Sequence, residues 1–274
     1  MVPLTRFGLA AVLALGLPAL AQTPVVGENG VVNAASAGRD APAPGSLVSI
    51  FGTNLASDLA RADTVPLSAA LNNVSVTINN LAAPLLFVSA GQINAQVPWD
   101  ALPADSDSGT GTVVVTRNGL SSDPRTFSLQ RFSPLVYTLS SVAAPAATLA
   151  LAVNNDDGTV AQLENAIPGI KSKPAKPGGV LVIYASGLGP VDPPIATGAV
   201  PGSGDKRPAT TTPVVLIGDQ QAEVMFAGLA PDFAGVYQVN VTIPAAVTPG
   251  NAVSLRVRIG EATSAASVTI AVRN

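Results

Sequence analysis

The sequence of 274 residues contains no cysteine and no histidine. Without cysteine, core packing must hold the fold together without disulfides. The absence of both residues also excludes Ser-His and Cys-His catalytic pairs and the common zinc sites. A Ser-Lys pair remains formally possible. However, the four lysines lie in Pro/Gly-rich loops, which cannot bury an amine and so lower its pKa.

Aromatic residues make up 4% of the chain and charged residues 11%, and the net charge is −3. Such a chain lacks the basic surface that nucleic acids require, so no nucleic-acid partner is expected. Because glycan-binding surfaces generally present several aromatic rings, the scarcity weakens a glycan hypothesis without removing it. Hydrophobic residues reach 47%, with 25 glycines and 24 prolines. Many β-branched residues among many turn formers favour an all-β fold.

The N-terminus is typical of a secretory signal peptide over residues 1–21. A basic residue precedes the apolar run "FGLAAVLALGLPALA", and Ala19-Leu20-Ala21 is a small-x-small cleavage site. The run has about 15 residues and contains a proline, whereas a membrane-spanning helix needs about 20 apolar residues. We therefore expect export, a mature chain that begins at Gln22 without a membrane span, and a periplasmic, cell-surface or extracellular location.

Apolar and polar residues alternate in several short segments. In "VSVTIN" (74–79) and "QINAQVP" (92–98) every second residue is aliphatic, which is the period of a strand with one buried face. The segment "YQVNVTIP" (237–244) repeats the second of these in the same phase. Likewise, "PGSLVSIFGTNLA" (44–56) returns as "PGGVLVIYASGLGP" (177–190). Because the segments recur in the same order, the sequence contains two copies of one β-module.

The repeat predicts an all-β chain of two tandem immunoglobulin-like β-sandwiches. Short strands about ten residues apart, with turn signals between them and no sustained helical period, indicate this architecture. An extended lead-in over 22–43 precedes a first sandwich over 44–131, and a second sandwich covers 132–274. The second is expected to contain an extra hairpin at 149–164 and a long Pro/Gly-rich loop at 187–208.

Several sequence segments resemble those of known families: "NAAS", "PGSLVSIFGTNLA", "GQINAQVPW", "IYASGLGPVDPP" and "FAGLAPDFAGVYQVNVTIP". The Pro-Gly start, apolar strand and Gly-x-Asn-Leu exit resemble the IPT/TIG group of immunoglobulin-like domains. The longer phrases are similar to an uncharacterised C-terminal domain family of exported bacterial proteins, notably acidobacterial ones. The resemblance covers essentially all of the mature chain and implies the same fold and export. It implies no activity and no site residue.

Uncharged polar side chains line one face of two matching strands. They are Gln92, Asn94 and Gln96 in the first half and Gln238, Asn240 and Thr242 in the second. Such a face suits a neighbouring strand, another protein or a glycan, and the plain alternative is a solvent-facing sheet. Trp99 is either a sugar-stacking platform or a cover for the edge of a core. The 187–208 loop is a further candidate surface, with disorder without function as the competing interpretation.

Acidic residues offer two weaker candidate sites. Asp105 and Asp107 in "DSDSGTG" resemble the start of a calcium loop but lack its distal carboxylate, so a flexible acidic loop is favoured. Ca²⁺ is the one cofactor considered, and none is expected. Glu164 lies near Asp156 and Asp157 across the expected hairpin, where paired carboxylates would suit glycoside hydrolysis and a solvated turn is the alternative.

These patterns predict a non-enzymatic exported module for protein docking, adhesion or surface architecture. Its expected partner is an extracellular or envelope protein. One alternative is a glycan-binding module that uses Trp99 and neighbouring polar groups. Another is an unrecognised Asp/Glu-dependent hydrolase.

Overall fold

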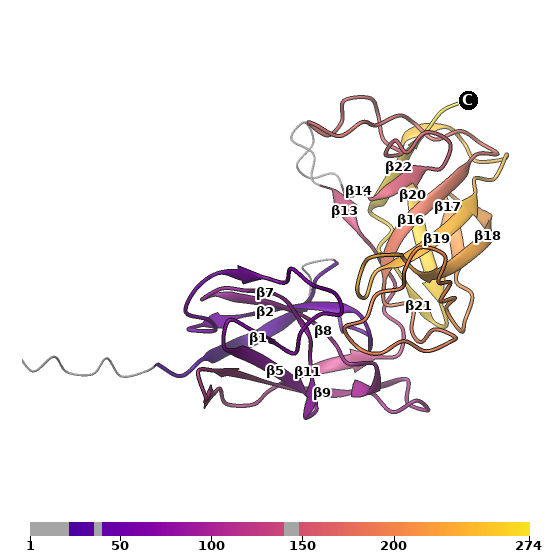
Figure 1. The fold of residues 1–274 in the computed structure, drawn as a ribbon. Helices are drawn as coiled ribbons and strands as arrows, with labels where there is room; N and C mark the ends of the chain where they lie inside the picture. The colour runs from indigo at the N-terminus through magenta and orange to yellow at the C-terminus, as the bar shows by residue number, and fades with distance from the viewer. Residues whose placement is uncertain (1–21, 36–39, 140–147) are drawn as a thin grey trace, which may run out of the picture.

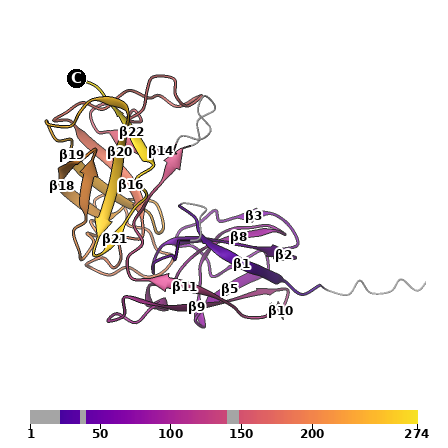
Figure 2. The same cartoon turned by 180° about the vertical axis from the view of Figure 1, so that it is seen from behind.

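Figures 1 and 2 show the chain as a computed structural model, which describes residues 22–35, 40–139 and 148–274. The signal peptide expected over 1–21 lies outside the described residues. Within them, the single helix is a three-residue 3-10 turn, η1 (Trp99–Ala101), and no helix is long and apolar enough to cross a membrane. The expected all-β fold is confirmed. Strands β1–β11 form a first sandwich and strands β12–β22 a second.

The first sandwich has two sheets that face each other, seen in Figure 1 as the β1, β2, β7, β8 layer and the β5, β9, β11 layer. One sheet has the order β1-β2-β8-β7-β3. The other has the order β10-β9-β5-β4, with β11 on β9 and β6 on β5. The strands are β1 (Val25–Asn33), β2 (Leu47–Thr53), β3 (Ala60–Arg61), β4 (Ala70–Leu71), β5 (Val74–Ile78), β6 (Leu81–Ala82), β7 (Leu85–Val88), β8 (Gln92–Gln96), β9 (Ser108–Arg117), β10 (Leu120–Ser121) and β11 (Arg125–Gln130). Val48 and Ile93 from the first sheet meet Val76 and Val113 from the second in one buried core.

The second sandwich is a single hydrogen-bonded path, β12-β16-β19-β18-β17-β20-β22-β14-β13, with β15 on β16 and β21 on β20. Its strands are β12 (Leu135–Val136), β13 (Thr138–Leu139), β14 (Thr148–Ala150), β15 (Ala152–Asn154), β16 (Val180–Ser186), β17 (Val214–Ile217), β18 (Gln220–Leu229), β19 (Tyr237–Thr242), β20 (Gly250–Ile259), β21 (Ala262–Thr263) and β22 (Val268–Val272). Its core is separate from the first and includes Leu181, Val239 and Leu255.

One strand of the second sandwich corresponds to two strands of the first. The start of β18 pairs with β17 and its remainder pairs with β19, so β18 joins the two layers. The aligned segments are "INNLAAPLLF" (78–87) and "IGDQQAEVMF" (217–226). Pro84 stands where the second half has Glu223. Because proline has no amide hydrogen to donate, the chain of the first half divides there into β6 and β7.

The predicted repeat is present in the packing as well as in the strand order. The inward residues of β8 and β19, with the residue after each strand, are at most 1% exposed: Ile93, Ala95, Val97, Val239, Val241 and Ile243. A buried serine recurs too. Ser122 Oγ accepts a hydrogen bond from the Val115 N–H at 3.1 Å, and Ser264 Oγ accepts one from the Val257 N–H at 2.9 Å. Each sandwich therefore closes this hairpin with the same contact.

The predicted turns adopt the conformations that their residues favour. Asn79 and Asn80 link β5 to β6 with φ angles of 50° and 63°, and Asn118 has a φ of 49° in the turn after β9. Asparagine tolerates this left-handed region better than other non-glycine residues, and such angles match the twist of a tight hairpin.

The segment expected as a lead-in, 22–43, is in part a strand of the first sandwich. β1 pairs antiparallel with β2, and its register shifts between Val26 and Val31. The intervening Gly27–Gly30 segment interrupts the alternation and conceals the strand in the sequence. A Cβ atom at Gly30 would lie 2.5 Å from the Phe51 carbonyl oxygen, so the close approach of the two strands requires glycine there.

The expected hairpin at 149–164 is less regular than predicted. Val153 and Val160 form one isolated bridge across the Asp156-Asp157-Gly158 turn. The flanking residues pair elsewhere, with β15 on β16 and β14 parallel to β22. The segment therefore extends the second sandwich at its edge rather than adding a free hairpin.

Candidate functional site

A pair of amide side chains faces outward from β8 in the first sandwich. Ile93 and Ala95 are buried, so the alternation of the strand directs Gln92 and Asn94 to the opposite face. Gln92 Nε2 donates to Asn94 Oδ1 at 2.8 Å, and Ser49 Oγ on β2 donates to the same oxygen at 3.0 Å. The pair is thus held in place by the sheet that carries it.

The second sandwich carries the same pair on β19. Gln238 Nε2 donates to Asn240 Oδ1 at 2.9 Å. Val182 stands opposite Asn240, where the first sandwich has Ser49, so this pair lacks the hydroxyl donor. Thr242 faces the same way and is half-buried beside Glu223 of β18. The predicted outward polar row is therefore present on β19 at all three positions.

Aromatic rings flank both amide pairs, and sequence reasoning missed them. Gln92 lies opposite Phe51 and Asn94 opposite Phe87, while Gln238 lies opposite Tyr184 and Asn240 opposite Phe226. The internal repeat could have revealed these rings, because an aromatic residue occupies the same position in matching segments. One pair of segments is "SIFGTN" and "VIYASG", and the other is "LLFVS" and "VMFAG". We name these sets the first face (Phe51, Phe87, Gln92, Asn94) and the second face (Tyr184, Phe226, Gln238, Asn240).

Gln96 does not belong to the accessible part of the first face. It is 1% exposed, because the second sandwich covers this end of β8. Its Nε2 donates to the Gly45 carbonyl at 3.0 Å, and its Oε1 accepts from the Gly198 N–H at 2.7 Å. The prediction that Gln96 is open to a partner is wrong, since both ends of its amide bind the chain itself.

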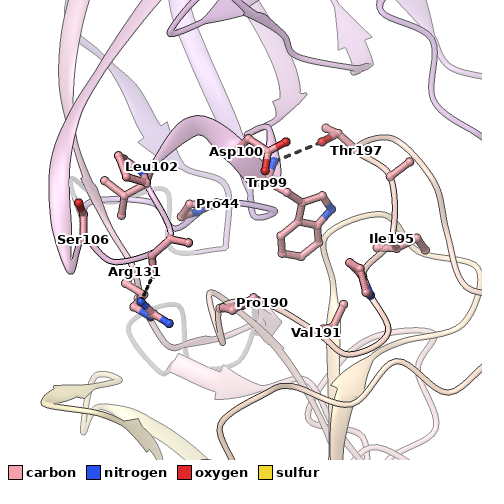
Figure 3. Close-up of a pocket in the computed structure, with 15 residues that line it drawn as sticks. Pro44, Trp99, Asp100, Leu102, Ser106, Arg131, Pro190, Val191, Ile195 and Thr197 are labelled. Atoms are coloured by element: carbon pink, nitrogen blue, oxygen red, sulfur yellow. Dashed lines mark hydrogen bonds between the residues drawn. The ribbon is translucent and has the colours of Figure 1, made fainter.

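Trp99 lies at the junction between the two sandwiches. Its indole points from η1 toward the loop that carries Val191 and Ile195 (Figure 3), and it packs against the core of the second sandwich. Its backbone N–H donates to Thr197 Oγ1 at 3.2 Å. The ring packs against Gly45, where a Cβ atom would come within 2.1 Å of the indole. Trp99 therefore joins two domains rather than presenting an open ring face.

The 187–208 loop docks onto the first sandwich. The Leu67 N–H donates to the Gly198 carbonyl at 2.8 Å, and Gly198 has a φ of 87°. At the start of the loop, the buried Tyr237 hydroxyl donates to the Gly189 carbonyl, and burial raises the pKa of Tyr237 above its usual value. Near its end, Arg207 pairs with Asp205 at 2.9 Å. The loop is thus a structural connection over much of its length.

A pocket of about 460 Å³ lies where this loop meets the first sandwich. Pro44, Trp99 and Ile195 contribute apolar walls, and Asp100 and Arg131 contribute charge (Figure 3). The Arg131 guanidinium also donates to the Ala104 carbonyl and so helps to hold the wall. The pocket is mainly apolar, and it depends on both sandwiches for its shape.

The acidic candidates do not gather into a site. Within residues 22–35, 40–139 and 148–274, no three acidic side chains lie close enough to hold a metal ion, and Asp105 and Asp107 are both exposed. Asp157 instead pairs with Lys173 at 2.6 Å. Hydrogen bonds from Lys173 and Thr159 lower the pKa of Asp157 to about 2. This arrangement is an exposed ion pair on a turn, with no hydrogen bond to Glu164.

The comparison with known families reaches the first sandwich. Residues 41–129 match the family model of the IPT/TIG domain. This part of the chain is accordingly related to the immunoglobulin-like domains of the IPT/TIG group, as its motifs suggested. The match ends before the second sandwich, which contains the irregular 149–164 segment and the docked 187–208 loop.

No protein of curated function matches this sequence. Among solved structures, the surface glycan-binding protein PbSGBP-B from Prevotella bryantii is 13% identical with a TM-score of 0.27, and the alignment covers 88% of this chain and 41% of that one. The D00-D0 domain of intimin is 12% identical, with a TM-score of 0.21 and coverages of 89% and 98%. Domains 5-6 of the S-layer protein SbsC are 10% identical, with a TM-score of 0.24 and coverages of 92% and 99%. The chain spans less than half the length of the glycan-binding protein, and likeness of this degree carries nothing about function.

Proposed function

We propose that the protein is an exported, non-enzymatic recognition module that acts in protein docking, adhesion or surface architecture. The observation that supports this function is the duplicated, outward-facing amide pair: Gln92 with Asn94, and Gln238 with Asn240. Neutral amides on a rigid sheet can bind a partner by hydrogen bonds without the desolvation cost that charged groups incur.

The junction supports a role that requires fixed geometry. Gln96, Trp99 and the backbone of Gly198 connect the sandwiches through buried contacts. Because these contacts involve backbone groups and a tightly packed ring, we expect the two sandwiches to move as one unit. Two recognition faces on such a unit keep a constant separation, which suits a spacer or adhesive element at a surface.

Export is the second part of the proposal, and its support is the sequence of residues 1–21. The apolar run and the Ala19-Leu20-Ala21 site are those of a cleaved leader. A periplasmic, cell-surface or extracellular location follows, with an extracellular or envelope partner. The longer sequence phrases support membership of the uncharacterised C-terminal domain family of exported bacterial proteins that they resemble.

The geometry favours non-enzymatic recognition over an Asp/Glu-dependent hydrolase and over a glycan site built on Trp99. Trp99 is engaged by Gly45 and by the second core, so it offers less of a stacking platform than a free ring would. The best-placed carboxylate, Asp157, is neutralised by Lys173 on an exposed turn. Hydrolysis by Asp/Glu needs paired carboxylates across a cleft. We propose that no cofactor takes part.

Export and recognition can be tested with the full chain. When the protein is expressed with its own leader in a Gram-negative host, we expect to find it outside the cytoplasm. Its intact mass should be that of a chain whose first residue is Gln22. The purified mature chain should then co-sediment with cell envelopes of the organism that produces it. Glu164→Gln should leave this binding unchanged, because no turnover is involved. An uncleaved cytoplasmic chain, or a mature chain that stays wholly in the supernatant, contradicts the proposal.

A further inference from the structure

The two faces share an arrangement across three neighbouring strands. In the first face, Phe51 of β2 lies opposite Gln92 of β8, and Phe87 of β7 lies opposite Asn94. The second face reproduces this order on β16, β19 and β18, as defined above. Directly opposed residues on one sheet face have their Cβ atoms about 5 Å apart. Each amide pair is therefore bordered by one ring on either side.

The polarity of the amide pair leaves a defined outward pattern. Gln92 Nε2 donates to Asn94 Oδ1, so Gln92 Oε1 remains as an acceptor and Asn94 Nδ2 as a donor. Neither atom has a hydrogen-bond partner within the described part of the chain. Gln238 Oε1 and Asn240 Nδ2 form the same unpartnered pair there. Sugar hydroxyls can both donate and accept, so they can bind the free acceptor and the free donor of such a pair.

All four rings are partly exposed, and two of them have close neighbours. Phe51 is 41% exposed. The Arg61 guanidinium lies 5.7 Å from the centre of the Phe87 ring, and the Phe226 ring lies so close to Gly228 that a Cβ atom there would be 2.7 Å from its Cζ. Aromatic rings of this kind combine a large apolar surface with a fixed orientation. The C–H face of a pyranose ring is a suitable occupant.

Charge distinguishes among the possible partners. The eight residues of the two faces include no charged side chain, and Arg61 is the cation against the first face. An anionic polymer would find no cluster of cations here. A typical protein hot spot would be expected to bury an aromatic or Arg anchor in a pocket. An uncharged polyhydroxylated chain matches both the amides and the rings.

We infer that the first and second faces are two equivalent binding sites for a neutral polysaccharide. This inference rests on the proposed recognition function and names its ligand class. A polysaccharide chain that is long enough to reach both faces would bind with avidity, because its second contact would be intramolecular.

The first test is affinity electrophoresis of the mature chain in gels that contain dextran, mannan, xylan or hydroxyethyl cellulose. At least one of these neutral polymers should retard the protein, and anionic alginate should not. Phe51→Ala and Tyr184→Ala should each weaken retardation about tenfold or more, and the double variant should abolish it. Phe233→Ala is the matched control, since its ring is 56% exposed but lies outside both faces.

A second pair of variants preserves the packing. In Asn94→Asp and Asn240→Asp the carboxylate still accepts the bond from its glutamine, but the outward donor is lost. Each should reduce retardation, whereas Asn251→Asp, on an exposed asparagine outside the faces, should not. The inference is overturned if no neutral polymer retards the wild type, or if folded double variants migrate like it.

Envelope co-sedimentation separates this inference from the proposed function. Periodate, which cleaves vicinal diols, should abolish binding to envelopes, whereas protease treatment of the envelopes should not. The opposite result identifies a protein partner and overturns the glycan inference while recognition stands. If untreated envelopes fail to bind the chain, the proposed function itself fails.

Discussion

Replacing Gln96 with methionine removes the side chain that links the two sandwiches. The substitution leaves the Gly45 carbonyl and the Gly198 N–H without their partner, and both glycines are buried. An unsatisfied buried polar group costs about 1–3 kcal/mol. We therefore expect the junction to lose about 2–6 kcal/mol, while each sandwich keeps its own core.

Trp99 makes this loss measurable, because it is the one tryptophan of the chain and lies at the junction. Its fluorescence during urea unfolding reports the opening of the junction, and far-UV circular dichroism reports the strands. With an m-value of about 2 kcal/mol/M, the fluorescence midpoint should fall by about 1–3 M. Gln92→Met, on the outward part of the same strand, is the control and should shift it by less than about 0.5 M. A Gln96→Met midpoint equal to that of the control would refute the reasoning.

Three further predictions concern each sandwich and its charges. Ser122→Ala and Ser264→Ala should each destabilise their own sandwich by about 1–3 kcal/mol in chemical denaturation, because the Val115 and Val257 N–H groups lose a buried acceptor; equal stability of variants and wild type would argue against the shared contact. The Asp157 carboxyl has a pKa lowered from 3.8 to about 2 in the folded state, so its contribution is present above about pH 4 and disappears as the pH falls through about 2. Asp157→Asn should therefore flatten the dependence of Tm on pH in that window, and an unchanged profile would contradict the ion pair. Millimolar Ca²⁺ or a chelator should leave Tm unchanged. A Tm that rises with Ca²⁺ in the wild type but not in Asp105→Asn would instead support the calcium-loop hypothesis.

Much of the fold could be predicted because it depends on neighbouring residues. The alternation in "QINAQVP" and "YQVNVTIP" identified two strands and their buried faces, since side chains of a strand point to opposite sides. The Asn79-Asn80 turn was recognisable because few residue pairs tolerate left-handed angles. Where this local signal was interrupted, as at Gly27–Gly30 in β1, the strand was missed.

The candidate site could likewise be predicted only as far as it depends on neighbouring residues. Alternation placed Gln92, Asn94 and Gln96 on one side of β8, and it treats all three alike. Their environments differ because the 187–208 loop, about a hundred residues further along the chain, covers Gln96 and leaves the other two open. Likewise, the rings beside the amides are set by strand register, which depends on pairing between distant segments.

The sequence by itself therefore determined the alternating strands, the turns, the repeat and the side of the strand to which each alternating residue points, because these follow from the two-residue period and from turn chemistry. The tertiary structure alone decided which outward residues remain accessible, that Trp99 and Gln96 join the two sandwiches, and that rings flank both amide pairs. The physical reason is that covering and pairing are long-range contacts, made when segments far apart in the chain come together.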